Sequence, residues 1–179
     1  MENDRNEIFS IGEHTIVKDC KIGANTKIWH YCNIYGCEIG ENTQIGSYCQ
    51  IKPEVKIGDK CRIQDGVSIP EKTKIGSFVF IGPRVAFANE KFPSAMKVHN
   101  KEFTVEPVIV EDFVTIGLGA LISAGIKIGK NSFIGAGAVV INDVPENSVV
   151  VGNPSKIIGN VRDEKYKQHK INNDIYFKG

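Results

Sequence analysis

Large aliphatic residues recur at every sixth position over most of this chain of 179 residues, and this spacing constrains the fold more than any other feature. The series is Ile16, Ile22, Ile28 and Ile34, then, after one step of five, Ile39, Ile45, Ile51, Ile57, Ile63, Ile69, Ile75, Ile81 and Phe87, and later Val110, Ile116, Ile122, Ile128, Ile134 and Val140. A helix requires apolar residues at intervals of three and four, and an alternating strand requires them at intervals of two. The spacing fits neither pattern.

A period of six fits a short strand followed by a tight turn, with one large side chain per strand in a shared core. Such hexapeptide repeats predict an all-β parallel β-helix, in which three hexads complete one triangular coil. Successive coils would stack at the ordinary strand spacing of about 4.8 Å. The handedness of the coil does not follow from the spacing.

A second series of small or β-branched residues lies four places after the aliphatic one. Its members are Cys20, Thr26, Cys32, Thr43, Cys49, Val55, Cys61, Val67, Thr73, Val79, Val85, Val114, Ala120 and Ala138. Residues of this size fit beneath the corner of a narrow prism, so four of the five cysteines are explained as packing residues. Cys37 lies outside the series. The chain has no CxxC pair, so we expect its cysteines to be structural and to bind no metal.

The repeat is interrupted once, between Phe87 and Val110, by a segment much longer than one hexad. This segment, 88–107, carries polar and charged side chains, among them Asn89, Glu90 and His99. A long loop on a rigid scaffold costs ordering entropy and is a common place for binding residues. We interpret it as a wall or lid over a polar substrate. The alternative is a surface excursion without a role.

The repeat ends near Val140. We therefore expect one β-helix domain over residues 1–160, with the inserted loop at about 88–107, followed by a short polar C-terminal helix or tail over 161–179. Lysine and arginine total 22 against 21 acidic residues, and a net charge of +1 gives no reason to expect nucleic acid or an anionic membrane as a partner. The chain has no apolar run long enough to cross a bilayer, and its first ten residues lack the apolar core of a secretory signal. We expect a cytoplasmic protein with free cysteines.

Several stretches of the chain resemble the hexapeptide-repeat acyltransferases over about residues 10–160. The superfamily's coenzyme A end is similar to IGAGAVVINDVP at 134–145 and VGNPSKI at 151–157. Three further segments resemble bacterial N-acetyltransferases of nucleotide-linked 3-amino sugars: IWHYCNI at 28–34, KCRIQDGVSI at 60–69 and FIGPRVAFANEKFP at 80–93. The resemblance implies a left-handed helix and a cytoplasmic homotrimer with active sites between subunits. It also implies acetyl-coenzyme A as the donor, no metal, and a role in bacterial surface polysaccharide (lipopolysaccharide) biosynthesis on a dTDP- or UDP-linked sugar.

The resemblance also assigns residues to the site. Asn89 falls on the active-site asparagine of the family's Phe-Thr-Asn motif, with Ala88 in the place of the threonine. His30 and Gln64 fall on positions that line the sugar-nucleotide pocket, and Glu90 and His99 lie in the loop beside it. The positions implied for coenzyme A are Leu118 and Ala136 at the pantetheine arm, and Asn142, Pro154 and Lys156 at the adenosine end.

Acetyl transfer needs a neutral amine, a positioned thioester, a stabilised oxyanion and a proton acceptor. The Asn89 amide does not titrate near neutral pH, so we expect it to orient the amine or donate to the oxyanion. Histidine is the usual general base, but His14 lies in an irregular first coil and His169 in the tail. His30 belongs to one face and Asn89 to the next, so they would meet most easily across a subunit boundary.

Other functions remain open at this stage. A zinc carbonic anhydrase of the same fold binds its metal through three histidines, but the histidines here are isolated. A hexapeptide acyltransferase for another acceptor, such as another amino position, a free sugar or an amino acid hydroxyl, would carry the same donor end. A non-catalytic interaction module would keep the coil and fail to bind coenzyme A.

Overall fold

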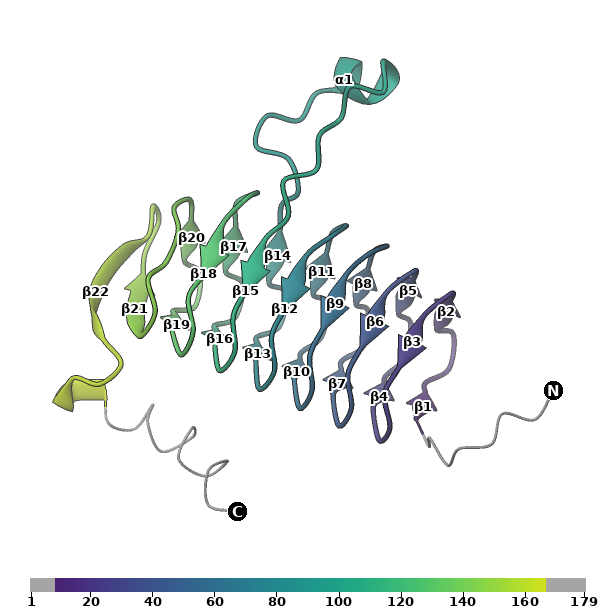
Figure 1. Ribbon diagram of the computed structural model, residues 1–179, viewed down its shortest axis with the longest axis horizontal. Coiled ribbons are helices and arrows are strands. Elements are labelled where there is room, and N and C mark those ends of the chain that lie inside the picture. Colours follow the sequence, from purple (N-terminus) through teal and green to yellow (C-terminus); the bar gives the residue numbers. More distant parts are fainter. Residues whose placement is uncertain (1–8, 167–179) are drawn as a thin grey trace.

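The computed structural model describes residues 9–166, which wind into a parallel β-solenoid of about eight turns (Figure 1). Each turn supplies a short strand to each of three sheets, because strands three apart in sequence pair in parallel. This architecture confirms the all-β parallel β-helix predicted from the sixfold spacing, and it is consistent with a left-handed coil. The expected C-terminal helix falls mostly on residues outside the described part. Its described portion contains a 3₁₀ turn, η1 (Glu164–Tyr166).

The strands form three sheets, which we name sheets A, B and C. Sheet A contains β1 (Ser10–Ile11), β4 (Lys27–Ile28), β7 (Gln44–Ile45), β10 (Arg62–Ile63), β13 (Phe80–Ile81), β16 (Thr115–Ile116), β19 (Phe133–Ile134), β21 (Ser148–Val151) and β22 (Lys156–Asn160). Sheet B contains β2 (Ile16–Lys18), β5 (Asn33–Tyr35), β8 (Gln50–Ile51), β11 (Ser68–Ile69), β14 (Ala86–Phe87), β17 (Leu121–Ile122) and β20 (Val139–Val140). Sheet C contains β3 (Lys21–Ile22), β6 (Glu38–Ile39), β9 (Lys56–Ile57), β12 (Lys74–Ile75), β15 (Ile109–Val110) and β18 (Lys127–Ile128). The antiparallel pair β21 and β22 ends the solenoid.

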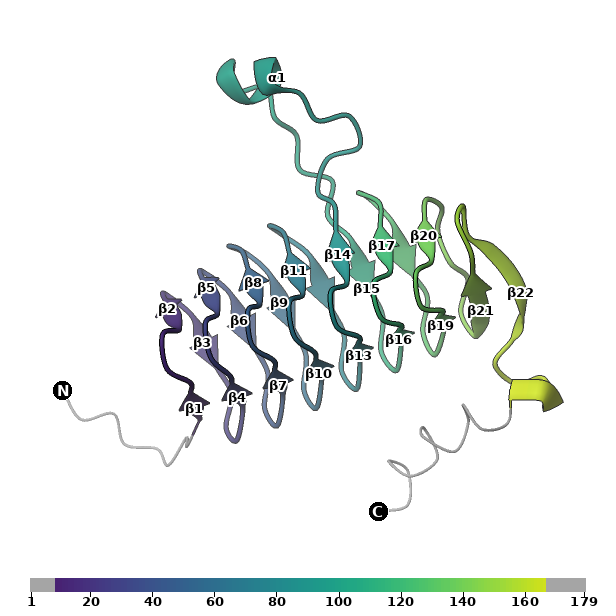
Figure 2. The ribbon, with the colours of Figure 1, turned by 180° about the vertical axis from the view of Figure 1, so that it is seen from behind.

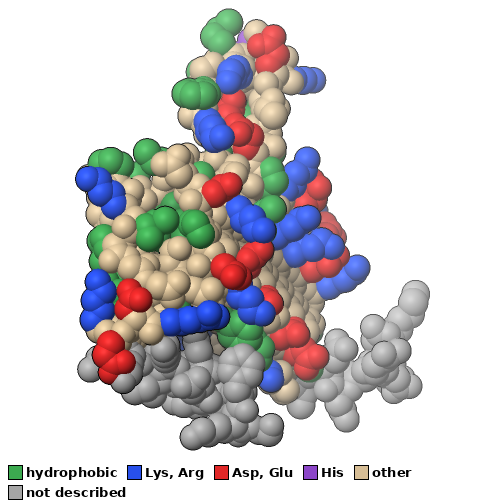
Figure 3. All heavy atoms as spheres, turned by 60° about the vertical axis from the view of Figure 1, so that its left-hand side comes forward, with side chains coloured by type: hydrophobic (Ala, Val, Ile, Leu, Met, Phe, Trp, Pro, Cys, Tyr) green, Lys and Arg blue, Asp and Glu red, His purple; other side chains and the backbone are tan. Residues whose placement is uncertain are grey.

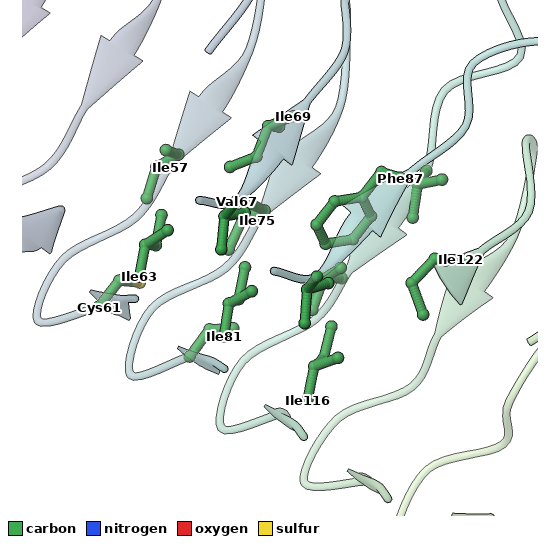
Figure 4. Close-up of a cluster of buried hydrophobic side chains, with 14 of the residues drawn as sticks. Ile57, Cys61, Ile63, Val67, Ile69, Ile75, Ile81, Phe87, Ile116 and Ile122 are labelled. Atoms are coloured by element: carbon green, nitrogen blue, oxygen red, sulfur yellow. The ribbon is translucent and has the colours of Figure 1, made fainter. Parts of the chain in front are cut away.

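The repeating isoleucines form the core. Strand register places Ile45 beside Ile63 and Ile63 beside Ile81, so one large side chain from each coil stacks on the next. Figure 4 shows Ile63 and Ile81 pointing into the interior together with Val67 and Cys61 of the small-residue series. The aliphatic series is buried from Ile28 to Val140. Ile16 is an exception at 62% exposed, because the strand register pairs Ile16 with Asn33 and Val17 with Ile34, so Val17 and not the predicted Ile16 packs against the core in the first coil.

The cysteines are free and packed against the core. Cys37 was the residue that the small-residue series did not explain, yet it is buried, and its Sγ lies 3.4 Å from the Sγ of Cys20. Cys37 lies two residues before Ile39, just as Cys32 lies two residues before Ile34, so it occupies the same corner of the coil despite the five-residue step. Burial raises the pKa of Cys37, and it raises the pKa of Cys61 to about 11.

Turns join the sheets along three edges of the prism. The AB edge consists of the turns 12–15, 29–32, 46–49, 64–67, 82–85, 117–120 and 135–138, and it faces the viewer in Figure 2. The BC edge carries the insertion, which leaves the solenoid between β14 and β15 (Figures 1 and 2). This projecting segment, the arm, spans 88–107 and carries the short helix α1 (Ala95–His99).

Sheet C is the charged face. Lys21 and Lys56 flank Glu38 at 3.5 and 3.2 Å, and Lys127 contacts Glu111 at 2.7 Å. Figure 3 shows acidic and basic side chains interleaved along one flank of the solenoid below the arm. Paired lysines and glutamates of this kind keep a sheet face solvated and discourage edge or face association.

Candidate functional site

One position of the AB edge adopts the same backbone conformation in every coil. It is occupied in turn by His14, Tyr31, Tyr48, Gly66, Arg84, Gly119 and Gly137, all with φ between 55° and 71°. From Tyr31 onward, the amide of each donates to a carbonyl of the preceding coil, as in Tyr48 to His30 at 3.0 Å and Gly66 to Ser47 at 2.8 Å. This conformation favours glycine, so the large side chains at four of these positions stand out.

Three of those side chains form a stack on the outside of the solenoid. The rings of His14 and Tyr31 lie 5.1 Å apart at 13°, and those of Tyr31 and Tyr48 lie 5.1 Å apart at 4°. Tyr31 is 51% exposed and Tyr48 is 64% exposed, so the stack is a surface feature. Its last ring, that of Tyr48, borders a hollow.

This hollow, which we name the AB groove, has a volume of about 640 Å³. It is lined by Tyr48, Asp65, Gly66, Pro83, Arg84, Leu118 and Gly119. Because Leu118 borders the groove, the position implied for the pantetheine arm is adjacent to the end of the aromatic stack. A groove with an arginine and a carboxylate over an apolar floor suits a polar molecule with an apolar part.

Two residues implied for the sugar nucleotide lie on or beside the same edge. His30 precedes Tyr31, and its Nδ1 accepts from the Glu13 amide at 2.9 Å. Gln64 lines a second pocket of about 340 Å³ with Trp29 and Arg62, and this pocket shares Asp65 with the AB groove. Gln64 therefore borders a surface hollow, whereas His30 lines neither of these two hollows.

The residues implied for coenzyme A are divided between two edges. Leu118 and Ala136 occupy successive coils of the AB edge, and the Gly137 amide donates to the Leu118 carbonyl at 2.8 Å. Pro154 lies in the turn between β21 and β22 and Lys156 begins β22, where the Ser155 amide donates to the Val139 carbonyl at 3.0 Å. Asn142, in contrast, follows β20 on the BC edge.

The base of the arm holds Asn89 firmly. Its Nδ2 donates to Glu71 Oε2 at 2.7 Å, and its carbonyl accepts from the Glu106 amide at 2.8 Å. Glu71 occupies the matching turn of the coil before, 18 residues earlier. A carboxylate can only accept, so it fixes which end of the Asn89 amide turns toward it. Glu71 was missed from the sequence, although that 18-residue offset could have identified it.

Glu90 lies inside the arm. Its side chain is 5% exposed, with Oε1 at 3.1 Å from Lys97 Nζ and Oε2 without a hydrogen-bond partner. Lys97 also donates to the Phe92 carbonyl at 2.8 Å, so this ion pair ties α1 to the arm's base. His99, at the end of α1, is exposed near the tip of the arm and away from Asn89 (Figure 1).

One copy of the chain therefore presents the expected site in two parts. His30, Gln64, Leu118, Ala136, Pro154 and Lys156 lie along or next to the AB edge, whereas Asn89, Glu90 and Asn142 lie on the BC edge. The strands of sheet B separate the two edges. Within 9–166, the structure contains no group of three His, Cys, Asp or Glu side chains arranged to hold a metal ion. The described helices are also too short to cross a membrane.

Comparison with known families identifies the repeat. The model described as bacterial transferase hexapeptide (six repeats) matches residues 19–53 and 36–71, and that of the hexapeptide repeat of succinyl-transferase matches 107–142. A Schizosaccharomyces pombe protein described as a candidate acetyltransferase is 40% identical over 91 residues, which are 50% of this chain and 44% of that protein. The 2,3,4,5-tetrahydropyridine-2,6-dicarboxylate N-acetyltransferase of Clostridium perfringens is 56% identical over 61 residues, which are 34% of this chain and 25% of that enzyme. The matched stretches thus cover less than half of these relatives.

Solved structures share the fold over almost the whole chain. A Bacillus cereus protein described as a candidate acetyltransferase has a TM-score of 0.67 at 22% identity, covering 95% of this chain and 94% of its own. A variant of AntD, an N-acyltransferase from Bacillus cereus, was solved with dTDP-4-amino-4,6-dideoxyglucose and coenzyme A. It has a TM-score of 0.62 at 18% identity and covers 95% of this chain and 91% of its own. At these identities the likeness is one of fold.

Proposed function

We propose that this chain is a hexapeptide-repeat acyltransferase that transfers an acetyl group from acetyl-coenzyme A to the amine of a nucleotide-linked 3-amino sugar. The observation that carries the proposal is the AB groove. It brings a position implied for pantetheine, Leu118, into the same hollow as polar side chains on the coils implied for the sugar nucleotide. Donor and acceptor would then meet end to end along one edge.

The named relatives support the chemistry. The Clostridium perfringens relative is an N-acetyltransferase, and the AntD structure holds a dTDP-linked amino sugar together with coenzyme A. Its sugar carries the amine at position 4, so the 3-amino position proposed here rests on the segments at 28–34, 60–69 and 80–93. Product sugars of this kind would serve bacterial surface polysaccharide (lipopolysaccharide) synthesis. Five free cysteines fit a reducing, cytoplasmic location.

The proposed reaction is a direct transfer. The neutral amine nitrogen attacks the thioester carbonyl, a tetrahedral oxyanion forms, the C–S bond breaks, and the departing thiolate takes the proton from nitrogen. Asn89 turns its NH₂ toward Glu71, so its Oδ1 is free to accept from the amine N–H and aim the lone pair. Acetyl-coenzyme A would supply the acyl group, with Leu118, Ala136, Pro154 and Lys156 along its path, and no metal is needed for any step.

Asn89 can reach this groove when another copy contributes it. The arm leaves the solenoid on the BC edge, and its side chains Phe92, Met96 and Val98 are 78%, 65% and 63% exposed. Exposed apolar side chains on a projecting arm suit contact with a neighbouring molecule. We propose a homotrimer in which the arm and Asn89 of one copy close the AB groove of the next, giving three equal sites.

The experiment is a screen of acetyl transfer with purified protein, acetyl-coenzyme A and a panel of dTDP- and UDP-linked 3-amino and 4-amino sugars. Release of the coenzyme A thiol and the mass of the acetylated product measure the reaction. Turnover on a 3-amino sugar is expected. Turnover on tetrahydropyridine dicarboxylate alone would favour the second candidate, which the Clostridium perfringens relative suggests. Absence of coenzyme A binding would leave a non-catalytic module.

A further inference from the structure

We propose that the gap at Gly66 in the stack of the AB edge is a binding slot for a nucleobase, held between the Tyr48 ring and the Arg84 guanidinium. This inference rests on the proposed function, and it names the part of the site that recognises the nucleotide. Neither the family match nor the sequence segments assign Tyr48, Gly66 or Arg84 a role.

The side chains that the protein itself stacks along the AB edge show what kind of group fits the slot. Three successive coils carry planar rings at this position, stacked 5.1 Å apart, and the fourth carries Gly66. A Cβ at Gly66 would meet Arg84 Cγ at 3.6 Å and nothing else within 4 Å, so the space outside Gly66 is open. The fifth position is Arg84, whose stem leans toward the opening. The stack on the AB edge therefore lacks one ring, at the level of Gly66.

The size of the opening fits one planar ring. Tyr48 and Arg84 lie two coils apart, which corresponds to about 10 Å at the ordinary strand spacing. A ring placed at the level of Gly66 would be separated from both by about the spacing that the protein's own rings keep. Stacking on an aromatic face is the common way in which proteins hold a base, and arginine stacks on the opposite face equally well.

Charge at the slot selects a nucleotide over an apolar ring. Asp65 is exposed at the rim, and its Oδ1 accepts from the Ser47 amide at 2.7 Å, which leaves Oδ2 to accept from a ring N–H. Arg84 can pair with a phosphate next to the ring as well as cover its face. A base with N–H donors and an attached diphosphate meets both requirements.

The base could come from the sugar nucleotide or from the adenine of coenzyme A. Position along the edge favours the sugar nucleotide. The residues implied for adenosine, Pro154 and Lys156, lie at the far C-terminal end of the solenoid, beyond Leu118 and Ala136. The slot lies on the other side of Leu118, next to the coils that carry His30 and Gln64.

The test uses the intact protein and isothermal titration with UDP, dTDP, pyrophosphate and coenzyme A. Gly66→Tyr completes the protein's own stack, and it is expected to fold because Tyr31 and Tyr48 adopt the same φ, near 60°. It should weaken UDP or dTDP binding at least tenfold, whereas Gly66→Ala leaves the slot open and should change binding about twofold or less. Tyr48→Ala should weaken binding roughly tenfold. Tyr31→Ala, one coil further away, removes only the ring behind Tyr48 and should weaken nucleotide binding much less than Tyr48→Ala does.

Each result decides the proposal. Unchanged nucleotide affinity in folded Gly66→Tyr, or pyrophosphate bound as tightly as UDP and dTDP, would overturn it. Loss of coenzyme A binding in Gly66→Tyr with UDP and dTDP unaffected would place adenine in the slot and also overturn it. If the pattern of nucleotide binding is as expected while the wild-type chain acetylates no amino sugar, the slot stands and the proposed reaction falls.

Discussion

At the scale of single residues, the contact between Asn89 and Glu71 decides what the amide can do. One Nδ2–H is engaged by the carboxylate at 2.7 Å, so the carbonyl oxygen and the second N–H remain available to a ligand. The contact fixes which way the amide faces, and both roles that the sequence left open, orientation of the amine and donation to the oxyanion, stay compatible with it. The two residues lie outside the aliphatic core series, so changes at either should act on activity with little effect on stability.

Asn89→Ala removes the group that aims the amine. Loss of one preorganised polar group of this kind lowers kcat by roughly 10²–10³. Steady-state acetyl transfer measures the effect, with thermal melts as the folding control. His99→Ala should cost less, because His99 lies at the end of α1 near the tip of the arm. Near-normal kcat in a stable Asn89→Ala protein would remove this residue from the mechanism, and a larger loss in His99→Ala would place a base in the arm.

Glu71→Gln tests whether Glu71 acts through Asn89. A glutamine side chain can face either end of the Asn89 amide, so the fixed orientation is lost, and kcat should fall roughly tenfold with KM little changed. In an Asn89→Ala background the same substitution should have no further effect on kcat. Glu54→Gln, an exposed glutamate on the same edge one coil away, is the matched control. If the losses in kcat of the two single variants multiply in the double variant, Glu71 has a role separate from Asn89.

At the scale of elements, the sequence predicted the coil well because each hexad must place one large apolar side chain in the shared core. The buried isoleucines and the small residues after them appear in the structure where the spacing placed them, from Ile28 to Val140. The turns were less predictable. The stacking of Tyr31 on Tyr48 and the contact of Glu71 with Asn89 join residues 17 or 18 positions apart, which depends on the register across coils. Neither α1 nor the buried Glu90 follows from a periodic pattern.

A two-residue strand offers a matched test of that core. In β12, Ile75 is 4% exposed and its neighbour Lys74 is exposed. Ile75→Ala leaves a cavity between stacked coils and should lower the free energy of unfolding by about 2–5 kcal/mol. Lys74→Ala should stay within about 0.5 kcal/mol of the wild type. Urea denaturation measures both, and similar values for the two variants would contradict the assigned facing of the strand.

The Glu111–Lys127 ion pair of the charged sheet C face predicts that the stability of the protein depends on pH. The hydrogen bond and charge of Lys127 lower the pKa of Glu111 below its ordinary 4.5. When folding lowers the pKa of a carboxyl group, the group stabilises the folded state at pH values above its unfolded-state pKa. This stabilisation disappears as the pH falls through the folded-state pKa. Glu111→Gln should therefore lower the melting temperature slightly at neutral pH and have no effect well below 4.5, and the neutral-pH effect should shrink in high salt. An effect of Glu111→Gln that persists in strong acid would contradict this origin.

At the scale of the whole molecule, polarity is divided between the faces. Sheet C carries interleaved lysines and glutamates, while the aromatic stack, the AB groove and the arm with its exposed apolar side chains lie toward the other edges. The parts of the expected site are separated by sheet B within one copy. In the proposed arrangement, the AB edge of one copy therefore combines with the BC edge of another copy.

The proposed homotrimer makes two measurable claims. Sedimentation should give about three times the chain mass of 19.7 kDa at micromolar protein. Mixing two inactive variants should also restore activity, because Asn89→Ala damages the BC edge and Leu118→Glu damages the AB edge. In randomly mixed trimers, roughly a quarter of the sites would combine two intact edges. As the control, each variant is unfolded and refolded by itself. A monomer in sedimentation, or mixed trimers that stay inactive, would end the shared-site arrangement.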